Sequence, residues 1–307
     1  MNKNTSSRWA NLITEQRNPG SLHIDACSTK ETLHIINAED QKVAKAVEVV
    51  MDEITQAVDL IVEAFQNQGR LFYIGAGTSG RLGVLDASEC PPTYGVSPDL
   101  VQGIMAGGPA ALIRSQEGAE DQSEEGIKAL KDRNCSKQDV VMGIAASGVT
   151  PFVIGALNYA RQMGATTIFF SCNPEAAKTV DVHVRIIPQV GPEVITGSTR
   201  MKAGTATKLV LNMITTTAMV KLGKVYENLM VDLAPSCAKL RDRSERILSL
   251  VTGLDQEQSQ QALLQAGDDL KTAIVMNKRA VSQQTARQLL SQNNGIVKRA
   301  LEDNTQA

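Results

Sequence analysis

The stretch Gly75-Ala-Gly-Thr-Ser-Gly-Arg81 decides the fold of this chain, because it joins a buried strand to a helix. The apolar run Leu71–Ile74 comes directly before it and has the length and composition of a strand that is covered on both faces. Glycines at such a junction let backbone amides approach a bound anion at the start of the following helix. The stretch therefore predicts an anion-binding turn at the carboxyl end of a strand.

The alternation of strand and helix continues beyond this turn. Further apolar runs of strand length are mostly separated by helical patterns, which predicts an α/β fold with a parallel sheet covered on both faces. The expected strands are Leu71–Ile74, Leu100–Met105, Val140–Ala145, Thr167–Phe170 and Val182–Ile187. The expected helices between them are Pro109–Glu117, Glu124–Lys131 and Pro151–Met163.

The segments that flank the sheet are mostly helical in pattern. Residues 1–37 predict an irregular arm, whereas apolar residues at spacings of three and four predict a helix over Ala38–Gln68. A long helix is expected over Thr199–Leu222, and shorter ones over Cys237–Val251, Gln256–Ala266, Leu270–Arg279 and Thr285–Glu302. We therefore expect an arm and helix in residues 1–60, a sheet domain in 61–234 and a small all-helical C-terminal region in 235–307.

Composition excludes several classes of partner. The 307 residues carry a net charge of −2 and only 3% aromatic residues, which argues against nucleic acid and anionic membranes as partners. The five cysteines lack a Cys-x-x-Cys pair and the three histidines lack ligand spacing, so no disulfide framework and no metal site are expected. Met1–Asn18 has no apolar signal core, and no apolar run reaches the ~18 residues of a membrane span, so we expect a cytoplasmic protein.

The glycines of the first turn leave the nature of the ligand open. Gly75, Gly77 and Gly80 match the G-x-G-x-x-G pattern, whose usual ligand is a dinucleotide. That ligand requires an acidic residue about 20 positions later, at the end of the second strand. Asp99 has the spacing but precedes the second apolar run. The hydroxyls of Thr78 and Ser79 instead favour a phosphate monoester, and a glycine turn without a ligand is the third alternative.

A second hydroxyl-rich turn, Ser147-Gly148-Val-Thr150, follows the third expected strand and precedes Pro151. Proline is favoured in the first turn of a helix, where its missing amide proton costs nothing. Turns at the carboxyl ends of parallel strands converge where open α/β sheets bind ligands. Ser147 and Thr150 are therefore expected to bind phosphate, to cap the following helix, or to do both.

The two turns together resemble the sugar isomerase (SIS) domain family, which binds phosphosugars on a three-layer αβα domain with a five-stranded parallel sheet. The resemblance rests on Gly77-Thr78-Ser79 in the first loop and on Ser147-Gly-x-Thr150 in the second, and it spans about residues 60–225. A common family form of the second loop begins Ser-x-Ser. Ala145 stands at the first of those serine positions, so one phosphate donor of the family is missing.

Two longer stretches, Gly75–Thr93 and Thr196–Lys208, are similar to the signatures of the N-acetylmuramic acid 6-phosphate etherases, a SIS family that resembles the glucokinase regulator. The resemblance implies removal of D-lactate from carbon 3 of the sugar during murein recycling, which yields N-acetylglucosamine 6-phosphate. In the open-chain sugar a base can remove the proton on carbon 2, the lactyl ether leaves, and water adds to the unsaturated aldehyde. This chemistry requires no cofactor.

The resemblance places the two catalytic roles on glutamates. Glu89 matches the proton donor to the leaving lactate, and Glu120 matches the second catalytic acid, the expected base at carbon 2. Without the resemblance, both would be read as solvated surface charges. Because a donor must hold its proton near neutral pH, Glu89 is expected in an apolar or acidic environment.

Cations and hydroxyls near the second signature are candidates for binding the substrate's anions. Arg200, Lys202 and Lys208 are expected to meet the phosphate or the lactyl carboxylate, or alternatively to form surface salt bridges. Ser198 and Thr199 would add phosphate donors or cap the long helix.

A straight helix would place Ser79 and Glu89 about 15 Å apart at 1.5 Å per residue, which is far for one small sugar. Either the helix ends before Pro91-Pro92, or Glu89 serves the site of a neighbouring subunit. We expect the second arrangement, a homodimer with a shared site, as the family implies. A non-catalytic sugar-phosphate-sensing regulator and a phosphosugar isomerase are the alternative functions.

Overall fold

The computed structural model describes residues 9, 11–232 and 238–303. The chain divides into two compact units. The first consists of Met1–Ser88 and Pro98–Thr215, and the second of Glu89–Ser97 and Thr216–Ala307. Two helices, α3 (Gly77–Tyr94) and α8 (Lys202–Lys221), therefore begin in the first unit and end in the second.

The sheet of the first unit has five parallel strands in the order β2-β1-β3-β4-β5. Each expected strand is present within two residues of its predicted bounds: β1 (Leu71–Gly75), β2 (Val101–Met105), β3 (Val140–Ile144), β4 (Thr166–Phe170) and β5 (Val184–Ile186). Every residue of β1 and β3 is buried, because these strands have neighbours at both edges and helices on both faces.

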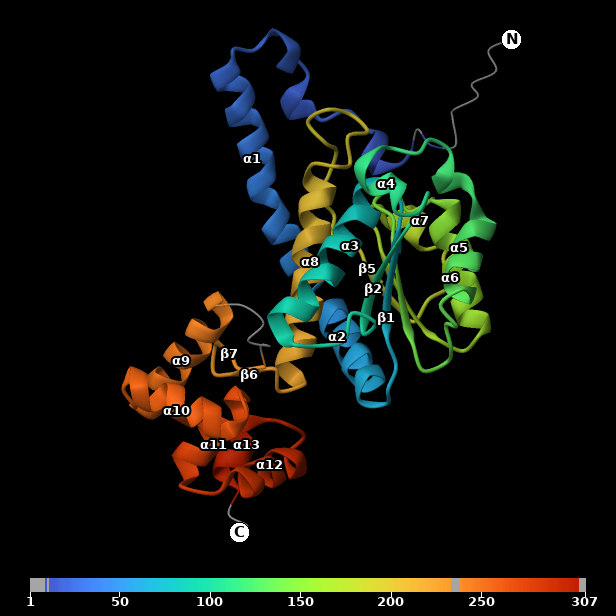
Figure 1. Cartoon of the computed structure of the whole chain (residues 1–307). Coiled ribbons are helices and arrows are strands. Elements are labelled where there is room, and N and C mark those ends of the chain that lie inside the picture. Colours follow the sequence, from blue (N-terminus) through green and yellow to red (C-terminus); the bar gives the residue numbers. More distant parts are fainter. Residues whose placement is uncertain (1–8, 10, 233–237, 304–307) are drawn as a thin grey trace, which may run out of the picture. The chain divides into compact units, whose positions relative to one another are not determined.

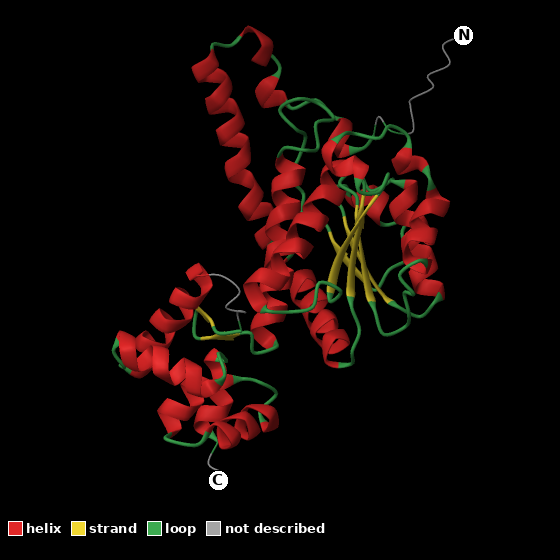
Figure 2. Ribbon diagram, viewed as in Figure 1, coloured by secondary structure: helices red, strands yellow, loops and turns green. Residues whose placement is uncertain are grey.

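Helices cover both faces of this sheet, which confirms the three-layer αβα prediction (Figures 1 and 2). One face carries α5 (Ser123–Lys131) and α6 (Pro151–Gln162), and the other carries α2 (Met51–Gln66) together with α3 and α8. Fully buried Phe72, Phe169 and Leu157 belong to the core that α6 shares with the sheet. Burial of apolar surface on both faces is the main force that holds the layers together.

The segment before the sheet contains more helix than predicted. The helix α1 (Thr29–Glu48) begins nine residues before the predicted start at Ala38, and three short 3-10 turns precede it: Ile13–Glu15, Pro19–Ser21 and Ile24–Ala26. A capping box explains the early start, because Ser28 and Glu31 each accept a hydrogen bond from the other's backbone amide. The expected single helix over Ala38–Gln68 is in fact α1 followed by α2.

Two further predicted helices differ from those observed. The helix expected over Pro109–Glu117 is the single turn α4 (Ala110–Ile113), since Arg114 is extended with φ −125° and ψ 132°. The helix expected over Thr285–Glu302 is divided into α12 (Gln283–Gln292) and α13 (Val297–Glu302). Asn294 and Gly295 lie between them with φ values of 54° and 71°, a left-handed conformation that ends a helix.

The second unit has its own apolar core, which includes Leu248, Leu263 and Ile274. It contains the helices α9 (Ala238–Thr252), α10 (Gln256–Ala266), α11 (Leu270–Arg279), α12 and α13, and a short hairpin of β6 (Val225–Tyr226) and β7 (Leu229–Met230). The helical C-terminal region was predicted, although Cys237 lies outside the described residues. The hairpin was not, because strands of two residues show no alternation.

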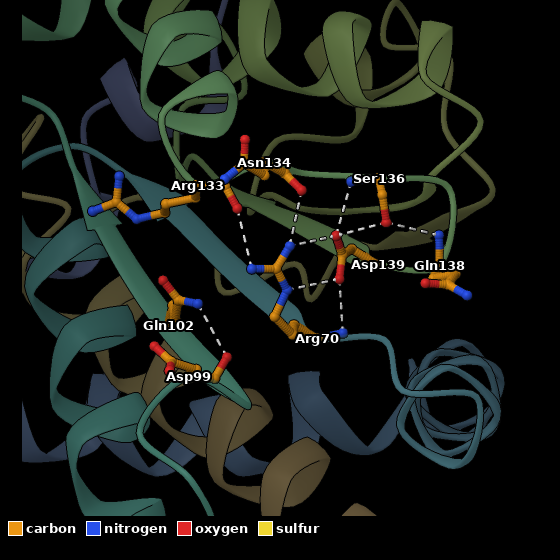
Figure 3. A network of polar contacts seen from close by, with 8 residues as sticks. All are labelled: Arg70, Asp99, Gln102, Arg133, Asn134, Ser136, Gln138 and Asp139. Atoms are coloured by element: carbon orange, nitrogen blue, oxygen red, sulfur yellow. Dashed lines mark hydrogen bonds and ion pairs between the residues drawn. The ribbon is translucent and has the colours of Figure 1, made fainter.

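The amino ends of the two central strands are tied together by an ion pair (Figure 3). The Asp139 carboxylate accepts hydrogen bonds from the Arg70 amide at 2.9 Å, from Arg70 Nε at 3.0 Å and from Arg70 Nη2 at 2.9 Å. Burial alone would raise the pKa of Asp139, but the bonds from Arg70 and the Ser136 amide lower it below its ordinary value. Among the interactions described, no such ion pair joins the carboxyl ends of the same strands, which continue into loops.

At the carboxyl end of β1, the first turn of α3 lies almost against the strand. A methyl group on Gly80 would lie 2.6 Å from the carbonyl oxygen of Gly75 and 3.0 Å from Met105 Cγ. The helix and strand approach this closely only because neither residue has a side chain. Gly77 is needed for a different reason, because its φ of 54° is left-handed.

We expect Gly80→Ala to destabilise the protein by about 1–3 kcal/mol, because the strand backbone cannot move away from the new methyl group. Gly204→Ala is the matched control, since its methyl group would meet nothing closer than Thr78 Cγ2 at 3.4 Å. In the first turn of α8 that change should be neutral or stabilise by up to about 0.5–1 kcal/mol. Urea denaturation of both variants measures the difference, and equal midpoints would contradict the close-approach argument.

Candidate functional site

A pocket of about 500 Å³ opens at the carboxyl edge of the sheet. Its volume lies within the usual range for small-molecule sites. Three loops that are distant in sequence supply most of its wall: the turn after β1, the turn after β3 and the segment before α8. The lining residues from these loops include Gly77, Thr78, Ser79, Ser147, Thr150, Ser198, Thr199 and Arg200. The two hydroxyl-rich turns therefore converge as predicted.

The first turn of α3 presents backbone amides at this pocket. Its first helical hydrogen bond runs from the Gly80 amide to the Ala76 carbonyl at 3.2 Å. Amides that precede this bond, those of Gly77, Thr78 and Ser79, have no carbonyl one turn earlier in the helix. Together with the positive end of the helix dipole, such amides favour an anion.

The turn after β3 adds a second helix start. The backbone amide of Gly148 donates to the Ala145 carbonyl at 2.9 Å, and its φ of 80° turns the chain toward Pro151. Thr150 is the N-cap residue of α6, but its hydroxyl makes no capping hydrogen bond. Thr150 was predicted to bind phosphate, to cap the helix, or to do both, and its hydroxyl does not cap α6. Gly148 itself lies outside the set of described residues that line the pocket.

The third wall is the segment before α8, and here a protein carboxylate already occupies the start of the helix. Buried Glu193 accepts hydrogen bonds from the Lys202 amide at 3.0 Å and the Ala203 amide at 2.9 Å. Burial raises the pKa of Glu193, and these bonds partly offset the rise. Ser198 and Thr199 do not hold those amides, and both residues line the pocket.

Lys202 was predicted as a candidate for the substrate's anions, and the structure contradicts this. Its side chain is only 2% exposed, and Nζ donates to Glu39 Oε2 at 2.6 Å. Among the described lining residues, Arg200 is the predicted cation that faces the pocket, whereas Lys208 does not line it. Lys208 is exposed on α8. Burial raises the pKa of Asp86, and the charge of Lys208 offsets part of that rise.

The remaining rim comes from the segment between β2 and α5, which was only partly anticipated. Glu120 lines the pocket from a short 3-10 turn, Ala119–Asp121, that is entered through Gly118 at φ 75°. Ser115 and Gln116 line it as well and were missed. Both follow the carboxyl end of β2, so the rule that identified the other two turns would have found them.

Arg81 was quoted in the first signature without a role, and the structure supplies one. Its Nη2 donates to the Ala111 carbonyl at 2.7 Å and its Nε to the Leu112 carbonyl at 3.0 Å. These are carbonyls of the last turn of α4, which have no partner within the helix. Arg81 thus fixes the segment that leads to Glu120, while its own side chain lines the pocket.

Glu89 is not among the described residues that line the pocket. The helix α3 continues through Pro91 and Pro92 to Tyr94, so the alternative in which the helix ends before Pro91 does not hold. Glu89 is exposed, and the apolar or acidic environment expected of a proton donor is not found around it in the described part of one chain.

One turn earlier on α3, buried Asp86 binds the helix to its neighbours. It accepts hydrogen bonds from Asn212 Nδ2 at 2.6 Å, Thr215 Oγ1 at 3.3 Å and the Tyr73 hydroxyl at 3.1 Å. Burial raises the pKa of Asp86, and the three donors pull it back. Asp86 therefore holds α3 against α8 and β1, which fixes the helix whose first turn lines the pocket.

Within the described residues, no group of three or more histidine, cysteine, aspartate or glutamate side chains is arranged to hold a metal ion. No described helix has both the length and the apolar character to cross a bilayer.

An αβα sheet with two helix starts and three hydroxyl-bearing loops at its carboxyl edge defines a sugar isomerase-type phosphosugar domain.

Comparison with known proteins agrees with this class. The profile of the glucokinase regulatory protein N-terminal SIS domain matches residues 53–161. A solved phosphoheptose isomerase from Neisseria gonorrhoeae is 16% identical, with a TM-score of 0.46 over 62% of this chain and 98% of that one, too loose a likeness to add to the argument.

Whole-chain relatives are much closer. N-acetylmuramic acid 6-phosphate etherase from Salinibacter ruber is 54% identical over 292 residues, which are 95% of this chain and 94% of the relative. The protein of that name from Mesorhizobium japonicum is 53% identical over 96% of both chains. This chain belongs to the N-acetylmuramic acid 6-phosphate etherase family.

From the pocket geometry we expect Ser79→Ala to weaken binding of N-acetylglucosamine 6-phosphate about tenfold, because a hydrogen bond to a charged ligand is lost. Thr150→Val, which keeps the shape but removes the hydroxyl, should act similarly. Ser88→Ala is the control on the same helix, since its hydroxyl donates only to the Leu85 carbonyl. Isothermal calorimetry would measure the three affinities, and equal values for all would refute the assignment of the phosphate end.

Proposed function

We propose that this protein is an enzyme that removes D-lactate from N-acetylmuramic acid 6-phosphate and so forms N-acetylglucosamine 6-phosphate. The observation that carries the proposal is that the two signature stretches, Gly75–Thr93 and Thr196–Lys208, both contribute to the lining of one pocket. Relatives that share more than half of the residues over nearly the whole chain bear the name of this activity.

The 6-phosphate is placed at the starts of α3 and α6. Amides and hydroxyls of Thr78 and Ser79 would hold it, with Ser147, Thr150 and Ser198 as further donors. These groups are neutral, so the fixed dipoles of the helix starts and Arg200 supply the positive potential. Ala145 is buried at the position where the related form has a serine, and Ser198 and Thr199 offer hydroxyls in its stead.

The reaction class follows from the chemistry of the open-chain sugar. A base removes the proton from carbon 2, which is acidic because it lies next to the aldehyde. The bond between carbon 3 and the ether oxygen then breaks, and lactate leaves with that oxygen and a proton from a general acid. Water adds to carbon 3 of the unsaturated aldehyde and returns a proton to carbon 2. The sequence is a carbon–oxygen lyase reaction followed by hydration, with no change of redox state.

Glu120 is the proposed base at carbon 2. It lines the same pocket as the two helix starts, and its 3-10 turn is fixed indirectly by Arg81 through α4. A general base contributes typically ~10²–10⁴-fold to a rate, so Glu120→Gln should lose activity on that order. The Gly118 turn places this carboxylate at the rim, where the substrate would complete its environment.

Glu89 is the proposed proton donor to the departing lactate, and it would act in the pocket of a second subunit. Its exposure on α3 and its absence from the described lining of its own pocket support this arrangement. Burial at the subunit interface would also give a carboxyl group the desolvated environment that keeps it protonated. The proposed assembly is therefore a homodimer with two shared sites.

The proposed setting is the cytoplasm, where the phosphorylated sugar from murein recycling is found, and no cofactor is proposed. A non-catalytic sensor would bind the same phosphate without needing Glu120 in its pocket. A phosphosugar isomerase would use a base at carbon 2 but would not release lactate. Release of D-lactate therefore separates the three functions.

Turnover in water enriched in oxygen-18 tests the lyase class. The heavy oxygen should appear on carbon 3 of the sugar and not in the lactate, because the ether oxygen leaves with lactate. Turnover in deuterium oxide should place deuterium on carbon 2. Mass spectrometry of both products makes the measurement, and heavy oxygen in lactate would mean that the other ether bond is cleaved.

The shared site predicts complementation between two inactive variants. Glu120→Gln and Glu89→Gln each damage a different half of a site, so mixed dimers should contain one intact site of two. Up to half of the wild-type activity per mixed dimer should return after the two variants are refolded together. Activity that never returns in verified mixed dimers would place Glu89 in its own subunit's site or outside catalysis.

A further inference from the structure

The segment that carries Ser198–Arg200 into the pocket is long and irregular. Fifteen residues separate the end of β5 at Ile186 from the start of α8 at Lys202, and none of them belongs to a helix or strand. Loops of this length inside a compact domain need support from other parts of the chain. The support here comes from the other end of the sequence.

The N-terminal arm, residues 12–21, holds this segment through three hydrogen bonds. Asn18 Nδ2 donates to the Pro192 carbonyl at 3.0 Å, and the Ser21 hydroxyl donates to the Val194 carbonyl at 2.8 Å. The backbone amide of Gly197 donates to the Thr14 carbonyl at 3.1 Å. Gly197 itself lines the pocket, directly before Ser198.

The arm is built for this contact and not for an apolar core of its own. Three of its buried side chains are polar: Thr14, Asn18 and Ser21, with 2%, 6% and 7% exposure. Buried polar groups are costly unless they are paired. Asn18 and Ser21 are paired with the segment, whereas the Thr14 hydroxyl has no partner among the described residues and Thr14 contributes through its backbone carbonyl. The Asn18 carbonyl oxygen Oδ1 also accepts from the Gly20 amide at 2.8 Å, which fixes the side chain's orientation.

A second layer of charge extends the contact to the start of α8. Glu39 of α1 accepts from Lys202 Nζ and hydrogen-bonds to Lys42 and Asn18. Burial would raise the pKa of Glu39, but these hydrogen bonds outweigh it and lower the pKa to about 2. Glu193, which holds the amides of Lys202 and Ala203, completes the chain of contacts from the arm to the helix.

We infer that Asn18 and Ser21 are positioning residues of the sugar-phosphate pocket, which act by fixing the segment that presents Ser198, Thr199 and Arg200. The inference rests on the proposed function for the identity of the ligand. Neither side chain lines the pocket, so each acts through the carbonyl that it binds. The loop residues bind substrate and transition state alike, so their displacement should raise KM more than it lowers kcat.

Asn18→Asp is the sharpest variant. It keeps the oxygen that accepts from the Gly20 amide but replaces the donor to Pro192 with a second oxygen beside Glu39. We expect KM for N-acetylmuramic acid 6-phosphate to rise about tenfold, with kcat within about threefold of wild type, because a buried carbonyl loses its partner. Ser21→Ala should raise KM in the same direction.

Ser28→Ala is the matched control, because it weakens the same N-terminal region at the cap of α1 without touching the loop. It should lower the melting temperature and leave KM unchanged. Affinity for N-acetylglucosamine 6-phosphate, measured by calorimetry on the full chain, provides a readout without turnover. Both arm variants should bind this product about tenfold more weakly.

The outcomes separate this inference from the proposed function. The positioning role is overturned if Asn18→Asp and Ser21→Ala have the KM and the product affinity of the wild type. It is also overturned if they change these two quantities no more than a Ser28→Ala variant of equal melting temperature does. If wild type itself neither binds the product nor releases lactate, the proposed function fails instead.

Discussion

The structure depends on the close approach of the first turn of α3 to the end of β1. A methyl group on Gly80 would lie 2.6 Å from the Gly75 carbonyl oxygen, which is shorter than the normal contact distance between a carbon and an oxygen that are not bonded. This contact sets how far the helix start lies from the sheet edge and hence where its amides point. Asp86 sets the other end of the same helix segment through donors from α8 and β1. Together they fix the position of the first turn of α3 relative to the sheet.

The pocket uses its helix starts selectively. Three long helices of the first unit begin at this edge of the sheet, but the start of α8 is occupied by the carboxylate of Glu193. The starts of α3 and α6 have no such carboxylate among their described contacts and carry the hydroxyls of Ser79 and Thr150 into the pocket. Under the proposed function, this arrangement would direct the dianionic phosphate to the starts of α3 and α6. Glu120, a carboxylate that would repel it, stands on the rim formed by a different loop.

The parts of the fold that the sequence predicts are those determined locally. Buried strands such as β1 and β3 consist of apolar residues and glycine. The turns that follow these two strands are recognised by glycine and hydroxyl residues beside the strand ends. The start of α1 is also determined locally, because the Ser28–Glu31 capping box is visible in the sequence. The prediction nevertheless began this helix at Ala38. Lys202 could not be assigned correctly, because its partner Glu39 lies 163 positions away. The same holds for Asn18 and Pro192, which are 174 positions apart.

A crystal structure with N-acetylglucosamine 6-phosphate bound tests the central claim most directly, because that claim concerns which end of the pocket holds the phosphate. The account predicts phosphate oxygens within hydrogen-bond distance, about 2.7–3.2 Å, of the amides and hydroxyls of Thr78 and Ser79, with carbon 3 of the sugar turned toward Glu120. A phosphate bound on the Glu120 rim, or on the outer face beside Lys208, would contradict it.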